Sequence, residues 1–254
     1  MSSMTPTSGD APIAAPFWRM VLSQTRAELL MTLRRGESLL ITVIIPILLL
    51  IFFTVFKVGG VSANFVVPGV MALALMSAGM VSLSIATAYE RYYGVLKRLG
   101  ASPLSRFGLI LAKSLSVVAL EIAQMVILAL LGVLVFGWRP TGSVALFVLV
   151  FLVGTATFSG LGMLMAGALR AEATLAGANG LYLLFVLLPG AVLPISALPI
   201  AALRPIAAAL PAAALSDALY GATQAGQFHG ASLLWLVIWG VIFFAAAAFT
   251  FKWE

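Results

Sequence analysis

A few polar side chains lie inside long apolar runs, where they could serve transport chemistry. Glu121 stands about fourteen residues from either end of the apolar run at 107–136. A charge near mid-membrane costs at least ~2.5 kcal/mol on insertion scales, so such a glutamate usually faces a cavity, a partner or a proton path. Gln124 follows one turn later and could share a hydrogen bond, and Lys113 precedes Glu121 on roughly the same face. These residues predict either a polar element of a translocation pathway or subunit interface, or a protonated glutamate satisfied by a neighbouring helix.

Sequence motifs of catalytic centres are absent. There is no G-x-x-x-x-G-K-[ST] and no Gly-Lys pair, so the chain cannot hold ATP in a P-loop. G-x-S-x-G and H-E-x-x-H are also missing. The chain has no cysteine and one histidine, His229, which we expect to be a solvated loop residue. We therefore expect no catalytic residues, no metal site and no cofactor bound by the chain itself.

The composition predicts an integral membrane protein. Hydrophobic residues make up 63% of the chain, the mean hydropathy is +1.15, and several apolar runs exceed eighteen residues. These values predict an all-α polytopic membrane protein rather than a soluble domain or a β-barrel. Residues 1–16 lack the basic start of a cleaved signal peptide, and their Ser, Thr, Pro and Ala content predicts a disordered tail.

Residues 17–254 are expected to form one transmembrane domain. Residues 17–37 mix arginines with Phe17, Trp18 and leucines, which suits an interfacial helix, although a cytosolic helix that merely orients the protein is the alternative. Six transmembrane helices should follow, with Pro46 kinking the first. The expected spans are about 38–56, 65–88, 107–136, 143–169, 175–195 and 232–251.

A cluster of prolines interrupts the apolar pattern before the last span. Five of the twelve prolines fall within 23 residues. Each interior proline removes a backbone hydrogen bond, and broken backbone at membrane depth is tolerated only where protein or a watery cavity surrounds it. We expect short broken or re-entrant helices over 189–228. The prolines of this segment are Pro189, Pro194, Pro199, Pro205 and Pro211.

The distribution of charge predicts the orientation. With six spans both termini lie on one side, and taking that side as cytoplasmic puts eleven Lys and Arg residues inside and three outside. This excess follows the positive-inside rule and accounts for the net charge of +6 without nucleic acid. Both termini are thus expected in the cytoplasm, and the proline cluster outside.

The stretch from Tyr89 to Arg106, YERYYGVLKRLGASPLSR, is polar between two apolar runs. Its aromatic residues and leucines fall on one helical stripe, with the charged residues off it. We expect a short amphipathic helix over 89–100 on the cytoplasmic side. It would lie along the bilayer surface or dock on a soluble partner.

Three stretches resemble type 2 ATP-binding-cassette (ABC) exporter permeases, the transmembrane subunits of drug-resistance and polysaccharide or lipid exporters. They are FVVPGVMALAL at 65–75, E-R-x-x-G-x-L-K-R-L-x-x-x-P at 90–103, and the proline-broken segment before the last span. With the basic N-terminal helix, the likeness extends over most of residues 17–251. The most specific of the three is the second, which matches the family's cytoplasmic loop.

The resemblance implies a permease that pairs with a second identical or homologous permease in a bacterial inner membrane. Two separate ATPase subunits, which bind ATP and Mg, would dock on the cytoplasmic loop and drive export of an amphipathic drug or lipid-like substrate. By the same analogy the pathway would lie between the two permeases, lined by spans one, two and five. The segment at 189–228 would act as an external gate, so we call its five prolines the gate prolines. The residues implied in ATPase coupling are Glu90, Arg91, Tyr92, Gly94, Lys97, Arg98 and Leu99.

Two functions from other classes stay open. A proton-coupled secondary transporter could use Glu121 as its proton carrier, but such transporters usually show matched broken helices in both halves. Here the single broken region near the C-terminus counts against it. A membrane scaffold or assembly subunit that transports nothing is the third possibility.

Overall fold

The computed structural model describes residues 15–34, 36–95, 97, 103–188, 190, 194–197, 200–224 and 228–250. This part of the chain is helical and contains no strand. The predicted tail falls almost wholly outside the described residues. The elements are α1 (Phe17–Arg34), α2 (Gly36–Val55), η1 (Val58–Gly60), α3 (Ala63–Met76), the π-helical η2 (Ser77–Ser82), α4 (Leu83–Tyr92), α6 (Arg106–Leu134), α7 (Val144–Ala168), α8 (Ala171–Leu187), η3 (Ile195–Ala197), η4 (Ala201–Leu203), α9 (Arg204–Ala209), α10 (Pro211–Thr223) and α11 (Gly230–Thr250).

Four helices are long and apolar enough to cross a membrane, so the chain is a multi-pass membrane protein. They are Ala63–Tyr92, Phe107–Leu134, Val144–Ala168 and Gly230–Thr250. The segments Ala201–Ala209 and Pro211–Thr223, bent by 77° at their junction, form a fifth span or a re-entrant loop. Thr42–Val55 and Ala171–Leu187 are apolar but shorter. The count of six spans therefore stays a prediction.

The helix expected to end at Ala88 continues further along the chain. The helices α3, η2 and α4 form one continuous stretch from Ala63 to Tyr92, and a turn follows at Tyr93 and Gly94. The first four residues of the predicted 89–100 helix therefore belong to the spanning helix. The helix continues past Ala88 because Glu90 contacts Lys113 of α6 and Arg91 donates to the Gly167 carbonyl of α7, so both charged residues have partners inside the bundle. Residues 98–102 lie outside the described part of the chain.

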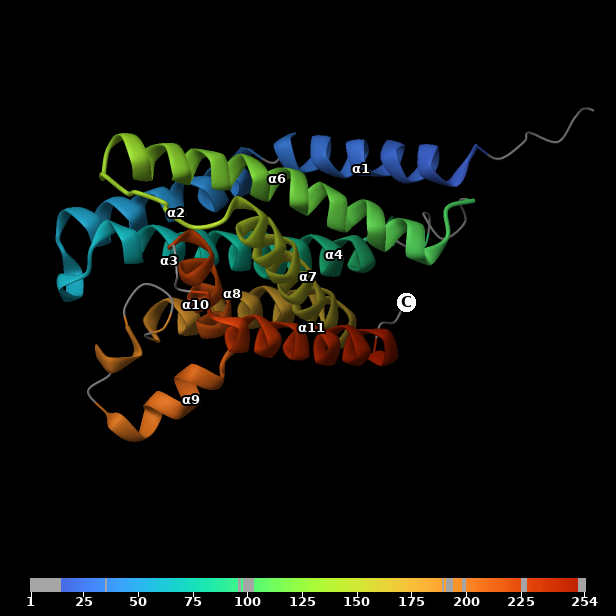
Figure 1. Ribbon diagram of the computed structural model, residues 1–254. Coiled ribbons are helices and arrows are strands. Elements are labelled where there is room, and N and C mark those ends of the chain that lie inside the picture. The colour runs from blue at the N-terminus through green and yellow to red at the C-terminus, as the bar shows by residue number, and fades with distance from the viewer. Residues whose placement is uncertain are drawn as a thin grey trace, which may run out of the picture.

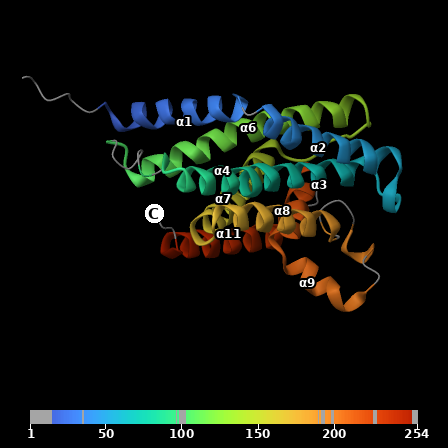
Figure 2. The same cartoon turned by 180° about the vertical axis from the view of Figure 1, so that it is seen from behind.

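The connections gather at two opposite ends of an elongated bundle. Figures 1 and 2 show the α2–α3 turn, the α6–α7 loop and the segment around α9 at one end. The start of α1, the end of α4, the start of α6 and the end of α11 lie at the other end. We call these the α9 end and the α4 end. Which of them faces the cytoplasm stays a prediction.

Helix α1 runs alongside the first half of α6 rather than away from the bundle (Figure 1). The ring of Phe17 stacks on Phe107 of α6, with ring centroids 6.5 Å apart and planes at 12°. Val21 of α1 is completely buried. The interfacial placement expected for residues 17–37 stays a prediction, because contacts with α6 do not locate the bilayer surface.

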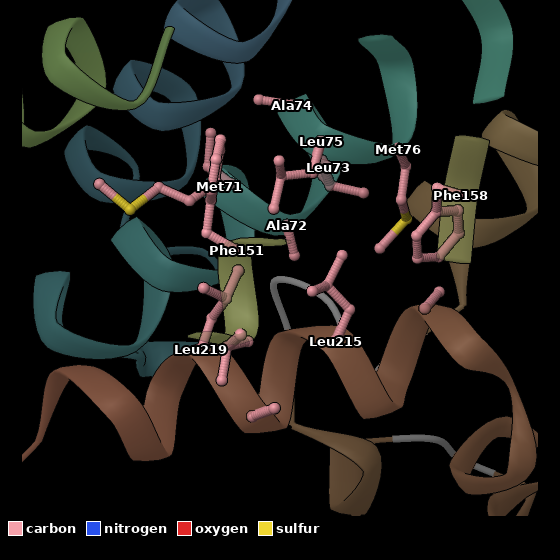
Figure 3. Packing of buried hydrophobic residues seen from close by; sticks show 14 of the residues in the cluster. Met71, Ala72, Leu73, Ala74, Leu75, Met76, Phe151, Phe158, Leu215 and Leu219 are labelled. Atoms are coloured by element: carbon pink, nitrogen blue, oxygen red, sulfur yellow. The ribbon is translucent and has the colours of Figure 1, made fainter. Parts of the chain in front are cut away.

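The core surrounds α3. Every residue from Val66 to Met76 is buried, so this helix is covered on all sides rather than along one stripe. Figure 3 shows Leu215 and Leu219 of α10 pointing toward α3, with Phe151 and Phe158 of α7 beside them. The interior helix therefore connects the α9 end of the bundle directly to the α4 end.

Glycine permits the closest helix approach in the core. A Cβ atom added at Gly162 of α7 would lie 2.6 Å from the carbonyl oxygen of Gly79 and 3.1 Å from that of Met80. Both carbonyls belong to η2, so the α7 backbone rests directly on the π-helical turn. Small residues at helix crossings allow this kind of backbone contact in membrane bundles.

We predict that Gly162→Ala destabilises the protein, because its methyl group would meet backbone atoms that cannot rotate away. The expected loss is about 1–3 kcal/mol in the free energy of unfolding, as for other overpacked cores. Denaturant titration in detergent micelles, followed by circular dichroism, would measure it. Gly180→Ala is the matched control, because Gly180 lies in α8 with nothing within 4 Å of an added Cβ. There the better helix propensity of alanine should add up to about 1 kcal/mol. Equal stability changes in the two variants would contradict the close contact.

Candidate functional site

Three charged side chains from three helices meet near the α4 end. The ammonium nitrogen of Lys113 in α6 lies 3.0 Å from Oε1 of Glu28 in α1 and 2.5 Å from Oε2 of Glu90 in α4. The side chains of Lys113, Glu28 and Glu90 are only 3%, 8% and 7% exposed. Gln24 donates a further hydrogen bond to Glu28 at 2.8 Å. We call Glu28, Glu90 and Lys113 the Lys113 triad.

The triad holds these helices in one register. Transfer of charged groups into a bundle is costly, and mutual attraction offsets the cost only when geometry and hydrogen bonding are good. Lys113 can contact both carboxylates only while α1, α4 and α6 keep their present relative positions. A small sliding of α4 would leave a buried carboxylate without its cation.

The neighbouring residue, Arg91, ties α4 to a different helix. Its Nη1 donates to the carbonyl oxygen of Gly167 at 2.8 Å, and its Nη2 donates to the carbonyl oxygen of Leu169. Gly167 lies in the last turn of α7, and Leu169 directly follows that helix. The last carbonyls of a helix lack intrahelical donors and carry a partial negative charge, so a guanidinium there is favourable. The end of α4 is thus fixed to α1 and α6 through Glu90 and to α7 through Arg91.

Beyond these ties the chain turns outward with exposed aromatic residues. The rings of Tyr89, Tyr92 and Tyr93 contact one another, with centroids 5.1–6.5 Å apart. Tyr92 and Tyr93 are each 65% exposed. Gly94 adopts φ +69° with open space around it, and Lys97 is exposed.

The predicted coupling residues therefore divide into two groups. Glu90 and Arg91 are internal ties, whereas Tyr92, Gly94 and Lys97 lie at the surface or in open space. Arg98 and Leu99 lie outside the described residues. Their coupling role stays a prediction. The sequence does not predict that Lys113 contacts Glu28 and Glu90. The spacing of residues within one helix cannot show which other helices pack against that helix.

Glu121 lies in the bundle interior between η2 and α7. It is completely buried, and Thr155 of α7 donates its hydroxyl hydrogen to Oε2. A Cβ atom added at Gly79 would lie 3.4 Å from Oε1, which has no hydrogen-bond partner among the described residues. A neighbouring helix, α7, thus satisfies one of the two carboxyl oxygens, and the role of Glu121 stays a prediction.

Gln124 binds the backbone of another helix rather than Glu121. Its side-chain amide donates to the carbonyl oxygen of Thr42 in α2 at 3.0 Å. Four residues later in α2 stands Pro46, which has no N–H to donate to that carbonyl. Gln124 thus replaces the helical hydrogen bond that the proline removes, as is required where no water reaches the backbone.

The described gate prolines lie at the α9 end. Pro205 and Pro211 stand at the first turns of α9 and α10, the positions where a missing N–H costs least. Trp235 and Trp239 of α11 donate to the carbonyl oxygen of Ala209, at 2.8 and 3.0 Å, where the chain bends between α9 and α10. Pro194 lines a cavity beside them. Pro189 and Pro199 lie outside the described residues. The role of these prolines in a gate stays a prediction.

His229 lies in the loop before α11, and its side chain is 34% exposed. Its Nδ1 also lies 2.8 Å from Oδ2 of Asp217 in α10. The sequence marks both residues as polar, but it does not show that α10 brings Asp217 next to the residue that precedes α11.

The family model described as "ABC-2 type transporter" matches residues 20–223 of this chain. The matched region begins in α1 and ends with the last residue of α10. It therefore contains the Lys113 triad, Arg91, the exposed tyrosines and the described gate prolines. Comparison with curated proteins gives no match.

We predict that Lys113→Met is strongly destabilising, because it leaves two buried carboxylates facing each other without a cation. Loss of one partner from a buried ion pair costs on the order of 3–5 kcal/mol. The triple variant Glu28→Gln, Lys113→Met, Glu90→Gln removes all three charges and should regain much of that loss. Unfolding free energies of the wild type and both variants measure this coupling. A triple variant less stable than Lys113→Met alone would mean that charge compensation is not what joins these helices.

Proposed function

The chain belongs to the ABC-2 type transporter family, and we propose that it is the permease of an exporter driven by ATP hydrolysis in separate subunits. Members of this family are membrane subunits that work with ABC ATPases and are not themselves catalytic. We infer that two such ATPases bind ATP and Mg and dock at the α4 end. The permease would pair with a second identical or homologous copy.

The exposed end of α4 is the observation that carries this proposal. Tyr92 and Tyr93 are each 65% exposed, an unusual position for large aromatic residues on a charged loop. Aromatic side chains are enriched in protein–protein interfaces, where their rings fill pockets of a partner. Lys97 is exposed beside them. This surface, which we call the tyrosine surface, suits docking of a soluble ATPase.

A force on the tyrosine surface would be passed to several helices together. Glu90 connects α4 to α1 and α6 through Lys113, and Arg91 connects it to the end of α7. If ATP-bound ATPases have higher affinity for one arrangement of the bundle, closure of the ATPase pair shifts the permease toward that arrangement. This is sufficient to drive exchange between inward-open and outward-open states.

The composition of the chain supports export of an amphipathic drug or a lipid-like molecule. The chain has ten methionines and sixteen phenylalanines against five tyrosines and five tryptophans, and 9% of its residues are charged. Apolar and methionine-rich surfaces adapt to varied apolar ligands. We place the protein in a bacterial inner membrane, with both termini and the tyrosine surface in the cytoplasm and the α9 end outside.

A proton-coupled secondary transporter is the alternative function. The observation in its favour is the completely buried Glu121 with one carboxyl oxygen lacking a hydrogen-bond partner in the described structure. Proton-gradient-driven uptake into vesicles that contain this chain alone would support it. Stoichiometric co-purification with an ABC ATPase would support the exporter instead.

We predict that Gly94→Trp leaves membrane insertion intact but abolishes transport by the assembled exporter. Gly94 stands one residue after the exposed Tyr93, and a bulky ring there would hold the ATPase away from the tyrosine surface. The measurements are membrane yield, co-purification of the ATPase and substrate-stimulated ATP hydrolysis.

Gly60→Trp is the matched control for this experiment. Gly60 also has positive φ, +67° against +69° at Gly94, and neither glycine has an atom within 4 Å of an added Cβ. The two substitutions therefore introduce the same ring and similar backbone strain at opposite ends of the bundle. Gly60→Trp should retain stimulated ATP hydrolysis. Wild-type stimulation in Gly94→Trp would refute the assignment of the coupling surface.

A further inference from the structure

A cavity of about 800 Å³ lies at the α9 end, between the start of α3, the residues after α8, and α9, α10 and α11. Small-molecule sites commonly measure about 300–1,000 Å³ and have mostly apolar walls. Phe65, Pro194, Pro205, Ala213 and Trp235 contribute apolar wall surface here. The cavity thus has the size and lining of a site for a drug-sized molecule.

The polar groups of the cavity lie together on one side of it. Asp217 and Ser216 are neighbours in α10, and Ser232 lies at the start of α11. Oδ2 of Asp217 accepts the hydrogen of Ser232 Oγ at 2.5 Å and lies 2.8 Å from His229 Nδ1. Within the described residues no donor contacts the second oxygen, Oδ1. The Asp217 side chain is 46% exposed. One carboxylate oxygen is therefore held in place while the other stays available.

Ser216 of α10 also belongs to the cavity wall. The residue is 4% exposed, and its hydroxyl oxygen has no hydrogen-bond partner in the described structure and almost no accessible surface. Ser216 therefore shapes the wall beside Asp217, and Asp217 is the residue that presents an accessible charged group to the cavity.

Asp217 is the acidic group of the cavity, and it is the only acidic residue between Glu172 and Glu254 in the sequence. No lysine or arginine is among the described residues that line the cavity. Arg204 of nearby α9 donates to the carbonyl oxygen of Ser196 at 3.1 Å. The one cationic group that contacts Asp217 in the described structure is His229, and only when its ring is protonated. With His229 neutral, the Asp217 carboxylate gives the cavity a negative charge that favours a cation.

Two aromatic rings line the same cavity as Asp217. Phe65 of α3 and Tyr220 of α10 both line the cavity, with ring centroids 5.6 Å apart. The faces of such rings attract organic cations, and their edges pack against apolar bodies. An anionic headgroup would meet the Asp217 charge unfavourably, and a sugar would leave most of its hydroxyl groups against apolar walls.

We propose that this cavity binds amphipathic organic cations, with an amine or quaternary ammonium group at Asp217 and the apolar body against α3, α9 and α11. The inference rests on the proposed function, to which it adds a substrate class and an exit-side binding site.

The test measures binding to the purified permease in lipid nanodiscs, without ATP and without ATPase subunits. Rhodamine 6G serves as an amphipathic cation and Nile red as a neutral apolar dye, both followed by fluorescence anisotropy. Asp217→Asn retains the shape of the side chain but removes its charge. Rhodamine 6G affinity should fall roughly two- to fivefold, the range for a partly exposed charge pair, with Nile red unchanged.

Two further variants separate charge from shape and from folding. Ala208→Trp adds a ring to the cavity wall from an exposed position in α9, so it should weaken both dyes without disturbing the core. Glu172→Gln removes an exposed carboxylate in the first turn of α8, outside the cavity, and should change neither affinity. Size-exclusion profiles of all variants verify that they are folded.

Unchanged rhodamine 6G affinity in Asp217→Asn would overturn the proposal, and so would unchanged binding of both dyes in Ala208→Trp. Equal losses in Asp217→Asn and Glu172→Gln would also overturn it, because they would indicate attraction by overall charge alone. The failure of this site is distinguishable from failure of the exporter function. The first shows in dye binding to the permease alone, and the second shows in ATPase co-purification and stimulated hydrolysis.

Discussion

Charged groups inside an apolar bundle need partners, and at the α4 end these partners come from other helices. Glu90 and Arg91 are adjacent in sequence, so their side chains leave the helix about 100° apart. The Glu90 carboxylate contacts Lys113 of α6, which also contacts Glu28 of α1. The Arg91 guanidinium donates to the carbonyls at the end of α7. These directional bonds specify one relative position of the helices in addition to the packing of their apolar side chains. The end of α4 is therefore the point at which several helices are joined.

The same requirement explains how this chain tolerates its prolines. Pro46 deprives the Thr42 carbonyl of its helical donor, and the Gln124 amide supplies one from α6. At the bend between α9 and α10, the Ala209 carbonyl receives the indole N–H groups of Trp235 and Trp239. In both places a side chain from another helix supplies the donor. A bend that would be unstable in an isolated helix becomes a fixed feature of the bundle.

The sequence predicts the features that depend on hydropathy and on local chemistry along the chain. These features are the helical membrane character, the long apolar helices and the broken backbone around Pro205 and Pro211. The family can also be predicted from local sequence motifs. Prediction from the sequence fails for contacts that depend on which helices are neighbours. Lys113 stands near Glu121 along the chain, yet it binds Glu28 and Glu90 because α1 and α4 cover the first half of α6. Hydropathy also ends a span at the first charged residue, so the continuation of α4 to Tyr92 could not be seen without the partners of Glu90 and Arg91.

The continuous helix from Ala63 to Tyr92 joins the two ends of the bundle. Phe65 and Gly69 near its start line the cavity at the α9 end, and Tyr92 at its end belongs to the tyrosine surface. At 30 residues it is about 45 Å long, enough to cross the bilayer. Val66 to Met76 are enclosed on all sides, so this part cannot move by small amounts without repacking α7 and α10. Close-packed cores of this kind change between discrete arrangements rather than deform continuously. The π-helical turn at Ser77–Ser82 lies midway, against Gly162 and Glu121, and single π-helical turns inside α-helices are frequent at functional sites. The spanning helix is therefore a closely packed connection between the cavity and the tyrosine surface, with one irregular turn between them.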